Sequence, residues 1–140
     1  MTAFTPVISA KRAVERHLST MTPSIKIAYE GVRFDPPAGE MYLATQLIVN
    51  QPDDPTLGDK YYRERITFQV FVCDLLNKGT ADTLAKAEAI RTRFDKGLTL
   101  IEDSIRIHIT RTPQISGVVV TNDRLVVPVM IDAWAEVYKP

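Results

Sequence analysis

Residues 55–72 read PTLGDKYYRERITFQVFV, a turn that opens into a long strand whose first half is charged. Pro55 and Gly58 are residue types that punctuate a chain at turns. From Arg65 onward, polar residues alternate with apolar ones that begin at Ile66, and this period is typical of a strand with one polar and one apolar face. Such a strand suits contact with a partner better than turnover of a substrate.

The rest of the chain predicts two helices and four further strands. A first helix is expected to open at Pro6 with Thr5 as its cap, because proline fits the first helical position. A second helix is expected to end at Gly97, a residue type that commonly terminates helices. The expected elements are a helix carrying Val7, Val14, Leu18 and Met21 on one side, strands at 25–29, 41–49 and 61–72, a helix at 81–94, and strands at 105–110 and 124–138.

The order α-β-β-β-α-β-β predicts an α+β fold, with both helices on one face of a mostly antiparallel sheet of about five strands. A chain of 140 residues with 45% hydrophobic residues is expected to form one domain over residues 1–140. The core is predicted to combine inward helix residues with one sheet face. Its members are Val14, Leu18, Leu84, Ile90, Phe94, Ile66, Phe68, Ile107 and Ile109.

The opposite sheet face is predicted to be polar, which suits either water or a wet subunit interface. It carries Arg65, Thr67, Gln69, Arg106, His108 and Thr110. Pro128 interrupts the apolar run of the last strand and has no N–H for a central ladder, so it predicts an edge strand or a bulge. An exposed edge is protected or paired, and a neighbouring subunit is one way to pair it.

Composition argues against several classes of protein. Seventeen basic and seventeen acidic residues cancel, so the chain lacks the positive field of a dedicated DNA binder. The single cysteine, Cys73, forms no internal disulfide and is expected to be a buried thiol. The first residues lack the pattern of a secretory signal, and no apolar run reaches the ~18 residues of a membrane span, so we expect no membrane association.

Residues for catalysis or metal binding are scarce. The two histidines, His17 and His108, have no neighbouring ligands at metal-site spacing, so we expect no metal, no cofactor and no catalytic residue. Asp53 and Asp54 lie between prolines and are more typical of a turn than of acid/base catalysis. Trp134 is either partly buried core or, with Tyr138, an aromatic contact.

Charge is segregated along the middle of the chain. Between Arg33 and Lys60 there is no basic residue, and a basic cluster follows at once. The acidic residues are Asp35, Glu40, Asp53, Asp54 and Asp59, and the basic ones are Lys60, Arg63 and Arg65. Either these are solvated loops, or the patches meet between neighbouring subunits of a ring; acidic loops that line a lumen are a further alternative. The candidate interface residues are Asp53, Asp54, Asp59, Lys60, Arg63 and Arg65.

Four segments together resemble the tail-terminator-like proteins of long-tailed bacteriophages. They are PTLG at 55–58, YRERITFQV at 62–70, FDPPAG at 34–39 and FDKGL at 94–98. The resemblance implies a structural virion protein that forms a ring, usually a hexamer, on the head-proximal end of the tail tube. It implies the chain itself, the tube protein and a head-tail connector protein as partners, with DNA only as passing cargo. It places the protein in the virion tail, assembled in the host bacterial cytoplasm.

Other readings remain open from the sequence. A related neck, connector or minor tail protein could carry similar segments, and so could a binding domain that forms no ring. An enzyme with a site scattered over loops is disfavoured by the shortage of histidine, cysteine and convergent carboxylates. The apolar stretch between Gln114 and Asp123, with three consecutive valines, has no predicted contact.

Overall fold

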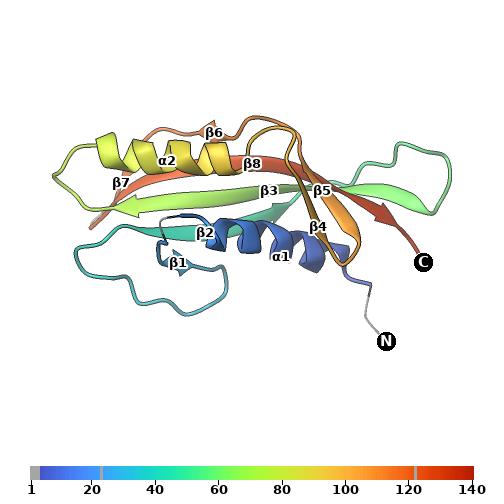
Figure 1. Cartoon of the computed structure of the whole chain (residues 1–140), viewed down its shortest axis with the longest axis horizontal. Helices are drawn as coiled ribbons and strands as arrows, with labels where there is room; N and C mark the ends of the chain where they lie inside the picture. Colours follow the sequence, from blue (N-terminus) through green and yellow to red (C-terminus); the bar gives the residue numbers. More distant parts are fainter. Residues whose placement is uncertain (1–3, 23, 122) are drawn as a thin grey trace.

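The computed structural model describes residues 4–22, 24–121 and 123–140. These residues form two helices and eight strands on one elongated sheet (Figure 1). The helices are α1 (Pro6–Ser19) and α2 (Ala81–Arg93). The strands are β1 (Ile27–Ala28), β2 (Tyr42–Val49), β3 (Tyr61–Asp74), β4 (Thr99–Glu102), β5 (Ile105–Ile109), β6 (Gln114–Ile115), β7 (Val119–Val120) and β8 (Leu125–Tyr138).

The two longest strands, β3 and β8, form the middle of the sheet. They pair antiparallel from Tyr61 opposite Tyr138 to Asp74 opposite Leu125. The strand order is β1-β2-β3-β8-β5-β4, and β6 and β7 pair with the first half of β8. The predicted α+β class is confirmed. The prediction of about five strands is wrong in detail, because β4, β6 and β7 are additional short strands and β1 pairs with β2 in parallel.

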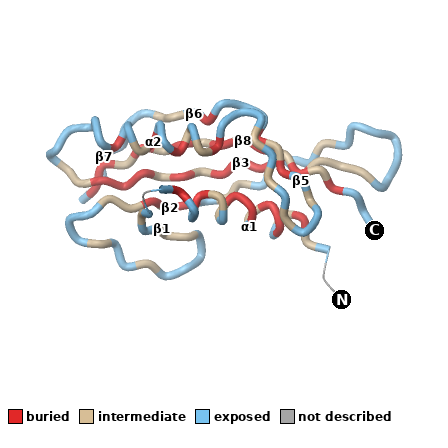
Figure 2. The backbone as a smooth tube through the Cα atoms, in the orientation of Figure 1, coloured by how far each residue is buried: buried red, intermediate tan, exposed pale blue. Residues whose placement is uncertain are grey.

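One apolar cluster lies between the helices and the sheet. Much of β3 and β8 and parts of both helices are buried (Figure 2). Apolar residues spaced three or four apart bring one side of each helix inward, and alternate residues of β3 face them. The rings of Phe68 and Phe94 lie 5.9 Å apart at the centre of this cluster. Of the predicted core, Val14, Leu18, Ile90, Phe94, Ile66, Phe68, Ile107 and Ile109 are buried, as expected.

Leu84 is the exception, and its assignment to the core was wrong. Its side chain is 37% exposed, whereas the preceding residue, Thr83, is fully buried. The Thr83 hydroxyl donates to Asp74 Oδ2 at 2.7 Å, which ties the first turn of α2 to the end of β3. Asp74 also accepts from the Leu75 N–H at 2.8 Å and lies 3.0 Å from Lys78 Nζ. A polar contact therefore orients this turn of α2 and leaves Leu84 outside.

The helix ends differ slightly from expectation. α1 begins at Pro6 as predicted, but the Thr5 side chain makes no capping hydrogen bond. α2 ends at Arg93, and Gly97 lies in the following turn, so the prediction that Gly97 ends the helix was wrong. Gly97 has a φ of +94° and donates its N–H to the Ile109 carbonyl at 2.9 Å. Its role is to turn the chain into β4 at a backbone conformation that glycine adopts without strain.

Pro128 lies in the central strand β8, so the predicted edge strand is wrong. The alternative prediction of a bulge fits the neighbouring segment, where residues 116–118 stand opposite only Val127 and Pro128. It pairs in register with Phe71 of β3, and its carbonyl accepts from the Ser116 N–H at 2.9 Å on the opposite side of β8. The N–H and C=O of one residue point to the same side of an antiparallel strand. The missing N–H of Pro128 therefore faces the segment between β6 and β7, where the neighbouring ladder is interrupted, so no central hydrogen bond is lost.

The core assignment predicts the effect of truncations. Leu18→Ala and Phe94→Ala remove fully buried side chains, so each should lower the free energy of unfolding by roughly 2–5 kcal/mol. Leu84→Ala serves as the control and should cost far less, because much of its side chain already contacts water. Urea denaturation measures all three, and an equal loss for Leu84→Ala and Leu18→Ala would contradict the packing described.

Asp74 predicts a dependence of stability on pH. Burial alone raises the pKa of Asp74, but hydrogen bonds from Thr83 and the Leu75 N–H, with Lys78, together lower that pKa below the ordinary 3.8. A carboxylate with a lowered folded-state pKa stabilises the fold above its unfolded pKa, and this contribution is lost as the pH falls through the folded pKa.

Asp74→Asn should therefore cost roughly 1–3 kcal/mol near neutral pH, and its difference from wild type should shrink in acid. Asp82→Asn is the matched control, because Asp82 is an exposed carboxylate on the first turn of α2, next to Thr83. Denaturation at neutral and acidic pH gives the comparison. A difference that stays constant across this range would contradict a charged, hydrogen-bonded Asp74.

Candidate subunit-interaction surface

The loop between β2 and β3 projects beyond the body of the molecule beside the C-terminus (Figure 1). We call residues 51–60 the arm. Its base is fixed by backbone hydrogen bonds in both directions between Asp53 and Arg63, at 2.9 and 2.8 Å. The Lys139 N–H donates to the Lys60 carbonyl at 2.7 Å, which ties the arm to the end of β8. The arm is thus anchored to both central strands.

The far part of the arm touches little of its own chain. Residues 54–60 are exposed (Figure 2), and Leu57 is fully exposed. A leucine at the tip leaves apolar surface in water that a contact with another molecule could cover, and covering it would be favourable. Asp54 and Asp59 flank Leu57, so the tip is apolar at its centre and acidic at its sides.

Two of the predicted interface residues pair within the chain. Arg63 lies 3.6 Å from Asp53 Oδ2, and its guanidinium lies 3.7 Å from the centre of the Trp134 ring. Tyr61 Oη accepts from Arg63 Nε at 3.2 Å. The acidic and basic clusters of the sequence therefore meet first inside one chain, where Asp53 and Arg63 stiffen the base of the arm.

The other predicted residues are placed for contact with a second molecule. Asp54, Asp59 and Lys60 are exposed on the arm. Arg65 is exposed on the sheet face that the helices leave uncovered, and it forms no ion pair with any described residue.

A hollow of about 380 Å³ opens on this uncovered face next to the arm. We call it the arm-base hollow, and its lining includes Asn50, Asp53, Arg65, Thr110, Arg111, Asp132 and Trp134. Asp132 Oδ1 accepts from the Thr67 hydroxyl at 2.9 Å, and Asn50 Nδ2 donates to the Thr67 oxygen at 3.0 Å. Arg111 lies 3.7 Å from Asp132 Oδ2. Thr67, predicted to be a surface residue, is buried by this network.

The sequence reasoning missed Arg111 and Asp132. The signal was present for Asp132, because along β8 Met130, Asp132 and Trp134 occupy alternate positions and so share one face of the sheet. The signal for Arg111 was absent, since it lies in a loop that the fold brings beside β8.

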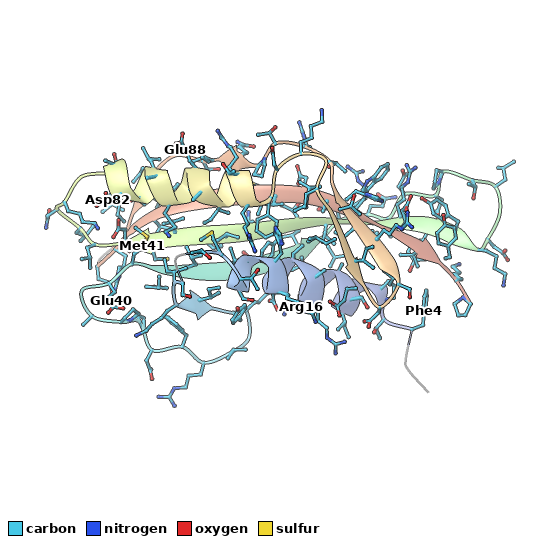
Figure 3. The ribbon with its side chains drawn as sticks, viewed as in Figure 1. Phe4, Arg16, Glu40, Met41, Asp82 and Glu88 are labelled. Carbon is cyan, nitrogen blue, oxygen red and sulfur yellow. The ribbon has the colours of Figure 1, made fainter. Side chains whose placement is uncertain are left out.

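The acidic run of the sequence is divided between two ends of the molecule. Asp35 and Glu40 lie in the loop before β2, and Glu40 is far from the arm (Figure 3). Arg124 holds this loop by donating to the carbonyls of Pro37, at 2.6 Å, and Glu40. The two acidic loops are therefore separate in the fold, because the eight residues of β2 lie between them.

The titratable groups that could support chemistry are engaged in structural contacts. His17 Nε2 lies 2.8 Å from the Arg93 carbonyl, and burial lowers the pKa of His17. His108 Nε2 lies 3.3 Å from Glu136 Oε2. Cys73 is buried, and burial raises the pKa of its thiol. The described part of the chain contains no group of three His, Cys, Asp or Glu residues suited to a metal ion.

Neither described helix has the length and apolarity that crossing a membrane requires.

An arm with an anchored base, a hollow beside it and an uncovered sheet face define a small α+β protein whose most distinctive surface is suited to macromolecular contact. The profile of the phage tail terminator family matches residues 9–132. The chain belongs to this family of structural proteins of the phage tail.

Comparison with solved structures supports the fold. One solved protein aligns with this chain with a TM-score of 0.73 at 18% sequence identity. The alignment covers 96% of this chain and 97% of that one. No curated protein matches the chain.

Proposed function

We propose that the protein closes into a ring, most simply a hexamer, on the head-proximal end of the tail tube. There it stops tube polymerisation and provides the surface that joins the head. The observation that carries this proposal is the family match over residues 9–132, which includes most of α1, all of α2 and the arm. The exposed arm supports it further, because ring closure needs two unlike surfaces on each subunit.

The proposal names the partners and the place of assembly. The chain contacts copies of itself, the tail tube protein and a head-tail connector protein, and assembly takes place in the host bacterial cytoplasm with no role for a membrane. DNA passes through the ring without being held. The balance of seventeen basic and seventeen acidic residues is compatible with this, since a lumen rich in cations would bind phosphates.

Another neck, connector or minor tail protein is the main alternative, and a binding domain that forms no ring is the second. Tube growth in vitro distinguishes them from a terminator. Purified protein added to polymerising tube protein should give shorter tubes with a ring at one end, visible by electron microscopy. Tubes of the same length distribution with and without the protein would contradict the terminator function.

We further propose that the charged residues around the arm lie at the boundary between subunits. Asp54 and Asp59 contribute the acidic side, and Arg65, with Lys60, contributes the basic side. Asp53 and Arg63 support this contact indirectly, because their pairing fixes the base of the arm. Opposite charges on the two sides would set the order and angle of neighbours.

Charge reversal tests this boundary. Arg65→Glu should hinder assembly while the monomer stays folded, because Arg65 is exposed and forms no ion pair with a described residue. One rim contact is worth only about 1 kcal/mol, but the loss repeats at every interface of a closed ring. Asp54→Lys with Asp59→Lys should partly restore assembly of Arg65→Glu, as followed by analytical ultracentrifugation with tube protein where needed.

Glu88→Lys is the control, since Glu88 lies on the outer side of α2 away from the arm (Figure 3). Normal assembly by all the arm variants would exclude this boundary. If the lysine variants assembled normally and bound DNA in a salt-dependent way, the acidic tip would instead line the lumen.

A further inference from the structure

We propose that the tip of the arm docks into the arm-base hollow of a second copy of this chain, with Leu57 as the apolar anchor. This inference rests on the proposed ring and names the contact that closes it. It identifies the arm-base hollow as the site that binds the exposed side chain of Leu57.

The arm is organised in advance for such a contact. Its base is held by the backbone pairing of Asp53 with Arg63 and by the Lys139 N–H bond to Lys60. The rings of Tyr61 and Tyr138, which lie 4.8 Å apart, brace the same region. A segment already fixed in its bound shape loses less conformational entropy on docking. The structure thus fixes both ends of the arm while leaving Leu57 without a contact in its own chain.

The hollow complements the tip in charge and in chemistry. Residues 54–59 of the arm contain two carboxylates and no cation. Arg65 and Arg111 both line the hollow, and Arg65 has no acidic partner among the described residues. Two acids line the hollow, and both are already engaged: Asp132 by the Thr67 hydroxyl and by Arg111, and Asp53 by Arg63. The hollow can therefore receive an acidic segment without leaving its own carboxylates unpaired.

Trp134 supplies the apolar surface that a leucine would cover. It lines the hollow, is half-buried, and has Arg63 stacked on it at 3.7 Å. Tryptophan and arginine are the residue types that most often carry the binding energy of an interface, especially where a rim excludes water.

A second copy is the occupant because each chain offers both halves of the contact. The arm does not fill its own hollow, since Leu57 is fully exposed. When the arm of one copy occupies the hollow of the next, the pair retains one free hollow, on the first copy, and one free arm, on the second. Repetition of this unlike contact closes into a ring if the rotation between copies allows it.

Disulfide trapping between separately made variants tests the contact. Leu57→Cys is mixed with Thr110→Cys, in which the new thiol lies on an exposed residue that lines the hollow. After assembly, with tube protein where needed, mild oxidation should crosslink the two variants. The native Cys73 is buried and should not react. Leu57→Cys mixed with Leu84→Cys on α2 is the control and should give little product.

The double variant Leu57→Cys/Thr110→Cys tests the direction of docking. If the arm of each copy enters the hollow of the next copy, head to tail, oxidation should give a series of covalent oligomers. The largest should contain as many copies as the ring. A series that stops at the dimer would show reciprocal exchange between two copies and would overturn the head-to-tail contact.

Leu57→Ser tests the energetic role of the anchor. It should raise the concentration needed for assembly roughly tenfold or more, the effect of losing one well-buried apolar side chain. Leu84→Ser, at another exposed leucine, should have little effect. The docking would be overturned if the protein formed rings and stopped tube growth normally, but gave no crosslink and assembled equally well with Leu57→Ser. That result would leave the terminator function intact. Absence of rings and of tube shortening in wild type would overturn the proposed function itself.

Discussion

The antiparallel ladder between β3 and β8 is the constraint on which the rest of the structure depends. Each strand has 14 residues, and they pair without interruption. Because successive side chains point to opposite faces, this register sends Phe68 and Ile131 to the core and Asp132 and Thr67 to the uncovered face. A shift of one residue would exchange the two faces, so the hydrophobic core and the arm-base hollow are fixed by the same pairing.

The parts of this fold that a periodic pattern marks could be predicted from the sequence. Both helices, the long strands and nearly all of the core have an apolar repeat of three to four or of two residues. Short strands have no such repeat. β6 and β7 contain two residues each, and their strand geometry comes from pairing with β8 rather than from their own composition. Leu84 was misassigned because the hydrogen bond between Thr83 and Asp74, which orients α2, joins segments nine residues apart.

The candidate interaction surface was predictable only in part. The sequence marked the arm and the charges around it, and Asp54, Asp59 and Arg65 are indeed exposed. It could not show that Asp53 and Arg63 pair within one chain, because that depends on how the loop returns beside β3. The hollow combines residues from β3, β8 and the loop after β5, and linear spacing carries no information about such a combination.

The anchoring of the arm also has a mechanical consequence. The arm continues directly into β3 and is tied through Lys139 to the end of β8, and both strands run along the long axis of the molecule (Figure 1). Inter-strand hydrogen bonds are perpendicular to the strands. A force that pulls the arm along this axis therefore acts in shear on many inter-strand hydrogen bonds at once. It does not break these bonds one after another. A neighbour bound to the arm would thus be attached to the longest paired strands of the protein.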